Sequence, residues 1–101
     1  MSDNGLEFLL KLQAIVDDRR TADADRSYTA KLLNSGPARI AQKVGEEGVE
    51  VAIAAATGDR DGLRSESADL LYHLIVLLRS QGLSLQDVVA ELTRRHAGNG
   101  V

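Results

Sequence analysis

Two clusters of acidic residues lie inside stretches whose other residues are mostly apolar. The first cluster is Glu46-Glu47-x-x-Glu50, and the second is Glu66-x-x-Asp69. A carboxylate is costly to place against a hydrophobic core unless a positive charge or hydrogen bonds compensate it. Carboxylates repeated on facing helices are a common way to hold a divalent cation. Because the ligands would be oxygen atoms and the chain has no cysteine, the sequence predicts a site for Mg²⁺, or for Mn²⁺ in its place.

Helical geometry gathers the first cluster on one side of its helix. At about 100° per residue, Glu46, Glu47 and Glu50 fall within an arc of about 100°, and Lys43 lies one turn earlier on the same side. We expect the opposite side to face the core. That side carries four apolar residues: Ile40, Val44, Val51 and Ala55.

The second cluster lies in a helix that is apolar around nearly its whole circumference, so we expect this helix to be buried on most sides. Glu66, Asp69 and His73 are spaced by three and four residues and therefore share one narrow stripe. If the two acidic helices pack antiparallel, their carboxylates converge. Mg²⁺ prefers a few carboxylates together with waters and substrate phosphates, which points to phosphate chemistry. We interpret His73 as a hydrogen-bonded core histidine that orients Asp69, rather than as a ligand.

The same residues also allow simpler interpretations than a metal site. The first cluster alone is typical of a solvated helix face with ion pairs, and only the second cluster favours a metal for both. Lys43 could bind a phosphate, or it could only pair with Glu46 or Glu47. The segment Ser27-Tyr28-Thr29 with Lys31 could be a helix start and nothing more.

Length, charge and composition exclude several classes of protein. The 101 residues predict one small domain over residues 1–101, with a core from about residue 5 to about residue 96. The net charge of −3 leaves no basic field, so we expect no nucleic-acid partner. No apolar run approaches the roughly 20 residues that span a bilayer, and the acidic start is unlike a signal peptide. We therefore expect a cytoplasmic protein with no membrane contact, and its small size favours a partner subunit.

The spacing of apolar residues predicts an all-α fold. The first helix is expected to start at Asn4 and to end near Arg19, followed by a polar connection and a short helix over Tyr28 to Leu33. Turn and capping residues delimit three longer helices: one from Pro37 to Thr57-Gly58, one capped by Asp59 or Asp61 and ending at Gln81-Gly82, and one capped by Ser84 and ending near His96.

The two acidic clusters and their flanking segments resemble a known family. The clusters resemble the signature of the MazG-like all-α nucleotide pyrophosphohydrolases. Three longer segments are similar to the phosphoribosyl-ATP pyrophosphatases of histidine biosynthesis: Ser27-Tyr28-Thr29-Ala30-Lys31-Leu32, Arg39-Ile40-Ala41-Gln42-Lys43-Val44-Gly45-Glu46-Glu47 and Ala68-Asp69-Leu70-Leu71-Tyr72-His73-Leu74. The resemblance extends over most of the chain, from Leu6 to Arg95.

This resemblance implies an activity and a fold. The activity is the Mg²⁺-dependent hydrolysis of phosphoribosyl-ATP to phosphoribosyl-AMP and pyrophosphate, the second step of histidine biosynthesis. The fold is a MazG-like bundle of about four main helices, completed as a cytoplasmic homodimer. The sequence holds no cyclohydrolase domain of the kind fused to some relatives, so we expect the next step to need a separate protein.

The resemblance also implies roles for individual residues. Four carboxylates are expected to hold Mg²⁺: Glu47, Glu50, Glu66 and Asp69. Glu46 is expected to be a fifth catalytic residue, either as a further ligand or as the group that orients the attacking water. The expected substrate-binding residues are Lys43, which would neutralise phosphate charge, and as weaker candidates Tyr28, Thr29 and Lys31.

Two alternative functions use the same residues. A house-cleaning pyrophosphohydrolase would apply the same metal chemistry to ordinary or damaged nucleoside triphosphates. A helical dimerisation or adaptor module would use the acidic stripes for salt bridges with a partner, and Mg²⁺ would have no specific effect on it.

Overall fold

The computed structural model describes residues 5–98 and 100, and this part of the chain is all-α, as predicted. Its elements in chain order are α1 (Phe8–Asp18), the 3₁₀ turn η1 (Arg19–Thr21), α2 (Tyr28–Asn34), α3 (Pro37–Ala56), α4 (Arg60–Ser80) and α5 (Leu85–Ala97). No strand occurs over the described residues. The helix start expected at Asn4 lies outside them, and α1 begins at Phe8.

Side-chain caps determine where three of the helices begin. Ser27 Oγ accepts a hydrogen bond of 3.1 Å from a backbone N–H in the first turn of α2. Asp59, and not Asp61, caps α4 through a bond of 2.9 Å to Oδ1. Ser84 and Asp87 form a reciprocal capping box at the start of α5. Each cap of this kind contributes about 1 kcal/mol, and these predicted helix starts are confirmed.

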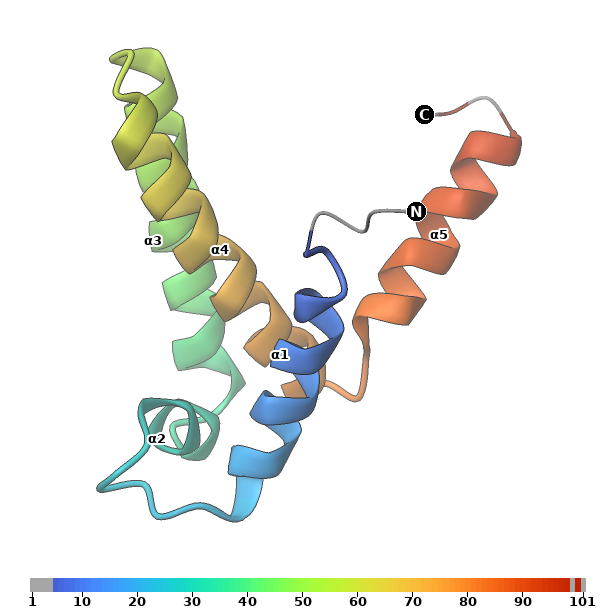
Figure 1. The fold of residues 1–101 in the computed structure, drawn as a ribbon. Helices are drawn as coiled ribbons and strands as arrows, with labels where there is room; N and C mark the ends of the chain where they lie inside the picture. Colours follow the sequence, from blue (N-terminus) through green and yellow to red (C-terminus); the bar gives the residue numbers. More distant parts are fainter. Residues whose placement is uncertain (1–4, 99, 101) are drawn as a thin grey trace.

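Proline and glycine mark the two ends of α3. Pro37 occupies its first position, where the missing N–H removes no helical hydrogen bond. Gly58 follows its last turn with a φ of 76°, a left-handed conformation that glycine adopts without steric cost. This turn reverses the chain, so that α4 runs back along α3 as an antiparallel pair (Figure 1).

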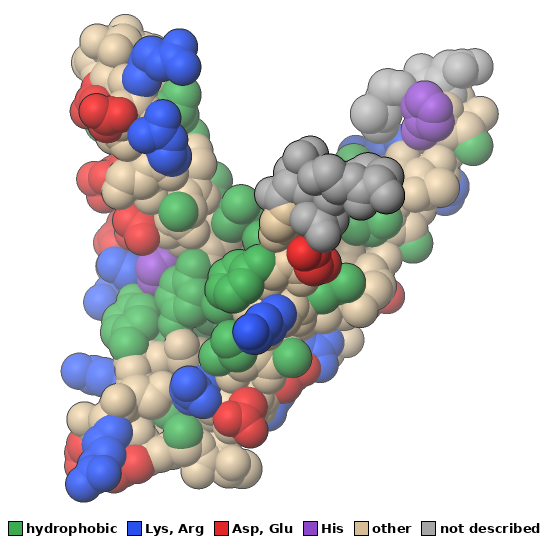
Figure 2. Space-filling view, viewed as in Figure 1, with side chains coloured by type: hydrophobic (Ala, Val, Ile, Leu, Met, Phe, Trp, Pro, Cys, Tyr) green, Lys and Arg blue, Asp and Glu red, His purple; other side chains and the backbone are tan. Residues whose placement is uncertain are grey.

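The helices form the two arms of a V (Figure 1). The α3–α4 pair is one arm. The helix α1 packs against the second half of α4, and α5 leads away from the base to form the other arm. Figure 2 shows hydrophobic side chains gathered in the hollow between the arms. Within a single chain, the bundle expected from the sequence is therefore open on one side.

A small core lies at the base of the V, where the first four α-helices meet. Its members expose no more than 4% of their surface: Val16, Leu32, Ile40, Ile75 and Val76. Full burial of an aliphatic side chain contributes roughly 1.5–3 kcal/mol. This core fixes α3 and α4 relative to each other near the end of the pair that α1 and α2 cover.

The expectation that α4 is buried on most sides is only partly met in the single chain. His73, Ile75 and Val76 are buried, whereas Leu71 is 44% exposed. The apolar circumference of α4 is thus larger than the surface that the other helices cover. Over the described residues, neither α4 nor any other helix has the length and apolar character needed to cross a bilayer.

One buried polar side chain attaches α5 to α1. Gln13 is 8% exposed, and its Oε1 accepts a hydrogen bond of 2.7 Å from the backbone N–H of Leu85. Its Nε2 donates to Oε1 of Gln86 at 2.9 Å. Both polar atoms of the side-chain amide therefore hold the first turn of α5.

Candidate metal centre

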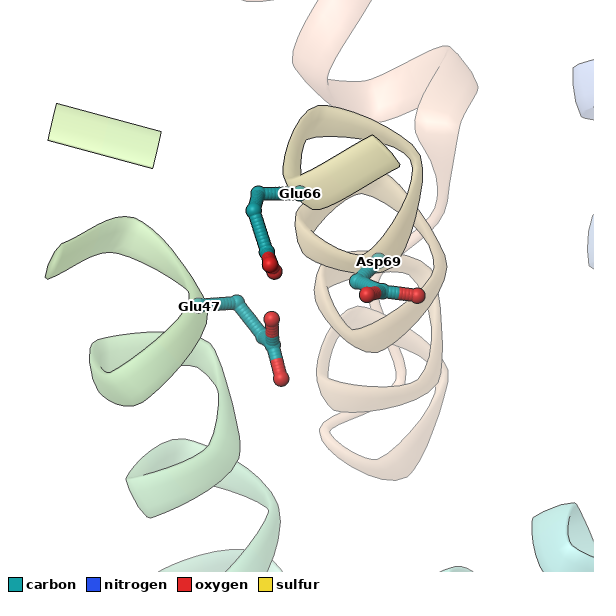
Figure 3. Close-up of side chains that lie close together, drawn as sticks. All are labelled: Glu47, Glu66 and Asp69. Atoms are coloured by element: carbon teal, nitrogen blue, oxygen red, sulfur yellow. The ribbon is translucent and has the colours of Figure 1, made fainter. Parts of the chain in front are cut away.

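Three carboxylates converge between α3 and α4. Glu47 extends from α3 toward α4, where Glu66 and Asp69 lie one turn apart (Figure 3). One carboxylate oxygen from each residue lies within 4.8 Å of the other two. The prediction that the acidic stripes of these two helices face each other is confirmed for these three residues.

The position of Glu47 on α3 differs from the sequence interpretation. Glu47 was expected opposite the apolar side, but it is buried on the same side as Ile40 and Ala54, while Ala55 is exposed. A spacing of seven residues is close to two helical turns, so Ile40, Glu47 and Ala54 form one row that faces α4. The expectation that all the charge of α3 lies opposite its core-facing side is therefore wrong for Glu47.

The carboxylate of Glu47 is incompletely compensated. The residue is 8% exposed, and its Oε1 is buried with no hydrogen-bond partner among the described residues. Its other oxygen, Oε2, lies 3.9 Å from Nζ of Lys43. An uncompensated buried carboxylate oxygen is costly, and a cation beside it would remove that cost. The residues present therefore fit a hard divalent cation.

The surroundings of Glu66 favour its protonated form. Burial raises the pKa of Glu66 above its ordinary value of 4.5, and the negative charges of Glu50, Glu47 and Asp69 raise it further. A bound cation would act in the opposite sense, because positive charge stabilises the carboxylate. The cluster has the excess negative charge that a cation site requires.

The other two predicted acidic residues lie at the margin of this cluster. Glu50, one turn further along α3, lines with Glu66 a hollow of about 170 Å³. The side chain of Glu46 is 47% exposed, and it accepts a hydrogen bond of 2.9 Å from Gln42 and lies 3.6 Å from Nζ of Lys43. This hydrogen bond and the charge of Lys43 lower the pKa of Glu46. Neither residue belongs to the group of three whose oxygens converge.

His73 is a buried, hydrogen-bonded residue and is 6% exposed. Its Nδ1 lies 2.8 Å from the main-chain oxygen of Asp69, and its Nε2 lies 3.0 Å from the hydroxyl of Tyr28. A carbonyl oxygen only accepts, so Nδ1 carries a proton, and in the tautomer protonated at Nδ1 alone Nε2 accepts from the hydroxyl of Tyr28. The predicted core histidine is confirmed, although it contacts the backbone of Asp69 and not its carboxylate.

The predicted substrate contacts in α2 have different surroundings. Two hydrogen bonds join α2 to α4. The hydroxyl of Tyr28 is bonded to His73, and the hydroxyl of Thr29 is bonded to that of Tyr72. Lys31 instead lines a hollow together with Tyr28 and Arg39. The sequence interpretation did not assign Tyr72 or Arg39 to the site. Arg39 could have been found from its spacing of four residues before Lys43, whereas no local pattern marks Tyr72.

Comparisons with known proteins agree with this arrangement. Residues 9–96 match the family described as phosphoribosyl-ATP pyrophosphohydrolase. A protein of Methylobacterium radiotolerans named phosphoribosyl-ATP pyrophosphatase is 56% identical over 93 residues, which cover 92% of this chain and 87% of that protein. The histidine biosynthesis bifunctional protein HisIE is 58% identical over 91 residues in Photobacterium profundum and 55% identical over 89 residues in Escherichia coli. This chain spans only 44% of the length of each of these two bifunctional relatives.

Proposed function

We propose that this chain, which belongs to the phosphoribosyl-ATP pyrophosphohydrolase family, hydrolyses phosphoribosyl-ATP to phosphoribosyl-AMP and pyrophosphate. The reaction is the second step of histidine biosynthesis, and we place it in the cytoplasm. The observation that carries the proposal is the buried Oε1 of Glu47, which has no hydrogen-bond partner within the described part and lies in a group with two further carboxylates. If this position served packing alone, the folded protein would be more stable with an apolar residue in place of Glu47.

The proposed cofactor is Mg²⁺, with Mn²⁺ as a substitute. Glu47, Glu66 and Asp69 would hold it, and Glu50 would join them from the next turn of α3. The donor set consists of carboxylate oxygens, and it leaves coordination positions for the waters and phosphate oxygens that Mg²⁺ prefers. When bound, the ion polarises phosphate oxygens, activates a water molecule and stabilises the departing pyrophosphate.

Two neighbouring side chains have proposed roles toward the substrate. Lys43 lies beside Glu47 and would neutralise part of the triphosphate charge. Glu46 would orient the attacking water, because its carboxylate is a hydrogen-bond acceptor one residue from Glu47 and 3.6 Å from Nζ of Lys43. Both are on the α3 side of the carboxylate cluster.

The test of this function is pyrophosphate release from phosphoribosyl-ATP, measured with Mg²⁺ and with a chelator. Glu50→Gln and Asp69→Asn should abolish release while the far-ultraviolet circular dichroism stays unchanged. Asp61→Asn is the matched control, because Asp61 is in the same helix as Asp69 and its side chain is 95% exposed. Full activity of either of the first two variants would refute the metal assignment.

The same assay separates the alternative functions. Faster release of pyrophosphate from ordinary nucleoside triphosphates than from phosphoribosyl-ATP would replace the proposed substrate with that of a house-cleaning enzyme. If Mg²⁺ changed neither turnover nor thermal stability, an adaptor module would be the better description.

We also propose that the protein is a homodimer. A groove of about 430 Å³ separates α1 from α5, and its lining is almost entirely apolar: Leu6, Leu9, Leu10, Leu85, Gln86, Val89 and Ala90. Val89 is 57% exposed and Leu6 is 66% exposed. Contiguous exposed apolar surface of this kind marks an interaction site, and a second copy of the same groove can cover it with two-fold symmetry.

The oligomeric state can be measured by sedimentation equilibrium. The wild type should sediment as a dimer, and Val89→Asp should shift it toward the monomer with its helical circular dichroism retained. A wild type that is monomeric at micromolar concentration would refute the homodimer.

A further inference from the structure

A second charged hollow lies apart from the carboxylate cluster. It has a volume of about 140 Å³ and lies between α2 and the first turn of α3, where it is lined by Tyr28, Lys31, Leu32, Ser35 and Arg39. Lys31 is in the last turn of α2, and Arg39 is in the first turn of α3. Two cationic side chains therefore face one small hollow.

The cations of this hollow are only partly compensated by the protein: Arg39 contributes the smallest of the effects that lower the pKa of Glu46. Lys31 and Arg39 form no ion pair with a carboxylate among the described residues, whereas Lys43 pairs with both Glu46 and Glu47. Arg39 also lies at the positive end of the α3 dipole, where a cation is slightly unfavourable for the helix. The presence of Arg39 at this position is therefore not explained by the stability of α3. It would be explained by an anion that binds in the hollow.

The hollow and the carboxylate cluster are on the same side of α3. Arg39, Lys43 and Glu47 are spaced by four residues, so they form one row in which Arg39 and Glu47 are separated by about 12 Å along the axis. Tyr28 lines the hollow and donates to His73, which in turn bonds to the backbone of Asp69. A substrate with phosphates at both ends could therefore reach both places at once.

The chemistry of the proposed substrate supplies such a second anion. Phosphoribosyl-ATP differs from ATP by a ribose 5-phosphate on the base, a monoester that carries a charge of about −1.5 to −2 at neutral pH. On the basis of the proposed function, we infer that Lys31 and Arg39 bind this phosphate monoester. The guanidinium can form two parallel hydrogen bonds to phosphate oxygens, and the ammonium adds a point charge. These residues then distinguish phosphoribosyl-ATP from nucleoside triphosphates, which have no phosphate at that end.

The first test compares two substrates. Lys31→Met and Arg39→Met should each raise the KM for phosphoribosyl-ATP by roughly 10- to 100-fold, the range for loss of one hydrogen bond to a charged group. The kcat/KM for pyrophosphate release from ATP, which lacks the added phosphate, should be the same in both variants as in the wild type. Lys11→Met and Arg60→Met are the matched controls. Each removes the same type of charge from an exposed residue that lies outside the hollow and forms no ion pair within residues 5–98. Equal losses on both substrates would show that the cations serve the triphosphate, and unchanged KM values would show that they serve neither end.

The second test does not depend on turnover. Ribose 5-phosphate is the probe, and its binding is followed by the amide chemical shifts of residues 28–39 in the full chain. The wild type should bind it, the two variants of the hollow should lose binding, and the two controls should keep it. If the wild type binds the probe in this hollow but does not hydrolyse phosphoribosyl-ATP, the proposed function fails and the phosphate site stands. If it hydrolyses the substrate but does not bind the probe there, the phosphate site fails alone.

Discussion

Glu47 of α3 and Glu66 of α4 bring carboxylate oxygens within 4.8 Å of each other across the helix pair. Two acids at this separation repel when both are ionised, and partial burial weakens the screening by water. Burial contributes most to the raised pKa of Glu66 and the charge of Glu50 next, and Glu47 and Asp69 raise it further. The α3–α4 pair therefore carries unfavourable charge that a divalent cation would neutralise.

Glu66 should contribute less to the free energy of unfolding of the metal-free protein as the pH rises above about 4.5, the ordinary pKa of a glutamate. The folded protein keeps the proton on Glu66 to a higher pH than the unfolded chain does. The contribution of this group is therefore complete below the unfolded pKa and is lost as the pH rises through the folded pKa. Glu46 and Glu91 have lowered pKa values and act in the opposite sense, so wild type must be compared with Glu66→Gln.

The measurement is thermal unfolding in a chelator from about pH 4 to about pH 8, a range that covers the titration of carboxyl groups. Glu66→Gln should gain in Tm relative to wild type as the pH rises, and added Mg²⁺ should reverse the order by stabilising the wild type. A difference in Tm that did not change with pH would contradict the account of Glu66.

Lys43→Met should separate a structural role of Lys43 from a role toward phosphate. Its ion pairs with Glu46 and Glu47 are long, at 3.6 and 3.9 Å. Loss of the pair with the half-exposed Glu46 should cost no more than about 1 kcal/mol of unfolding free energy. Loss of the pair with Glu47 should cost more, because that buried carboxylate is then left without a cation beside it. If Lys43 also neutralises phosphate, kcat/KM for phosphoribosyl-ATP should fall by roughly 10- to 100-fold. Urea unfolding and steady-state kinetics on the same preparation give both numbers. A variant that lost stability but kept its kcat/KM would leave Lys43 a salt-bridge residue only.

Local sequence patterns were sufficient for most of the helix boundaries and for two of the three carboxylates of the cluster. The cap at Ser84 and the helix start at Pro37 depend on residues within one turn, so the sequence predicted both, whereas for α4 it left Asp59 and Asp61 as alternatives. Glu66 and Asp69 lie three residues apart on one helix, and their convergence needs no tertiary information.

The remaining features of the site depend on how helices meet. The burial of Glu47 is decided by the rotation of α3 against α4, which turns the row of Ile40, Glu47 and Ala54 inward. The hydrogen bond between Tyr28 and His73 joins residues 45 positions apart. Contacts over such distances in the chain leave no periodic pattern in the sequence. The seven-residue spacing of Ile40 and Glu47, by contrast, already places both on one side of the helix, and the sequence interpretation overlooked it.

Gln13→Ala should loosen α5 more than any other element. The side chain of Gln13 provides the two hydrogen bonds that hold the first turn of α5, at 2.7 and 2.9 Å. Their loss should cost about 1 kcal/mol each at most, because water can replace part of each bond in the opened groove. Amide hydrogen exchange should become faster over residues 85–97 and should change little in α3 and α4. Exchange that became faster throughout the chain would instead show that α5 is part of one cooperative unit with the α3–α4 pair.

Tyr28→Phe should lower the unfolding free energy by about 1 kcal/mol, the usual net contribution of one hydrogen bond. The variant removes the hydroxyl that donates to His73 but keeps the ring, whose centroid lies 6.2 Å from that of Tyr72 and 5.9 Å from that of His73. Aromatic packing is therefore preserved, and the change reports on the hydrogen bond. Urea unfolding at fixed pH provides the measurement, with the m-value as a check that the unfolding transition is unchanged.

A double-mutant cycle with His73→Leu provides the control for Tyr28→Phe. In the His73→Leu background the hydroxyl of Tyr28 has lost its acceptor, so Tyr28→Phe should cost only a few tenths of a kcal/mol there. The same cost in both backgrounds would show that the tyrosine stabilises α2 by some other contact. A coupling energy of about 1 kcal/mol would instead show that this hydrogen bond joins α2, which carries Lys31, to the turn of α4 that carries Asp69.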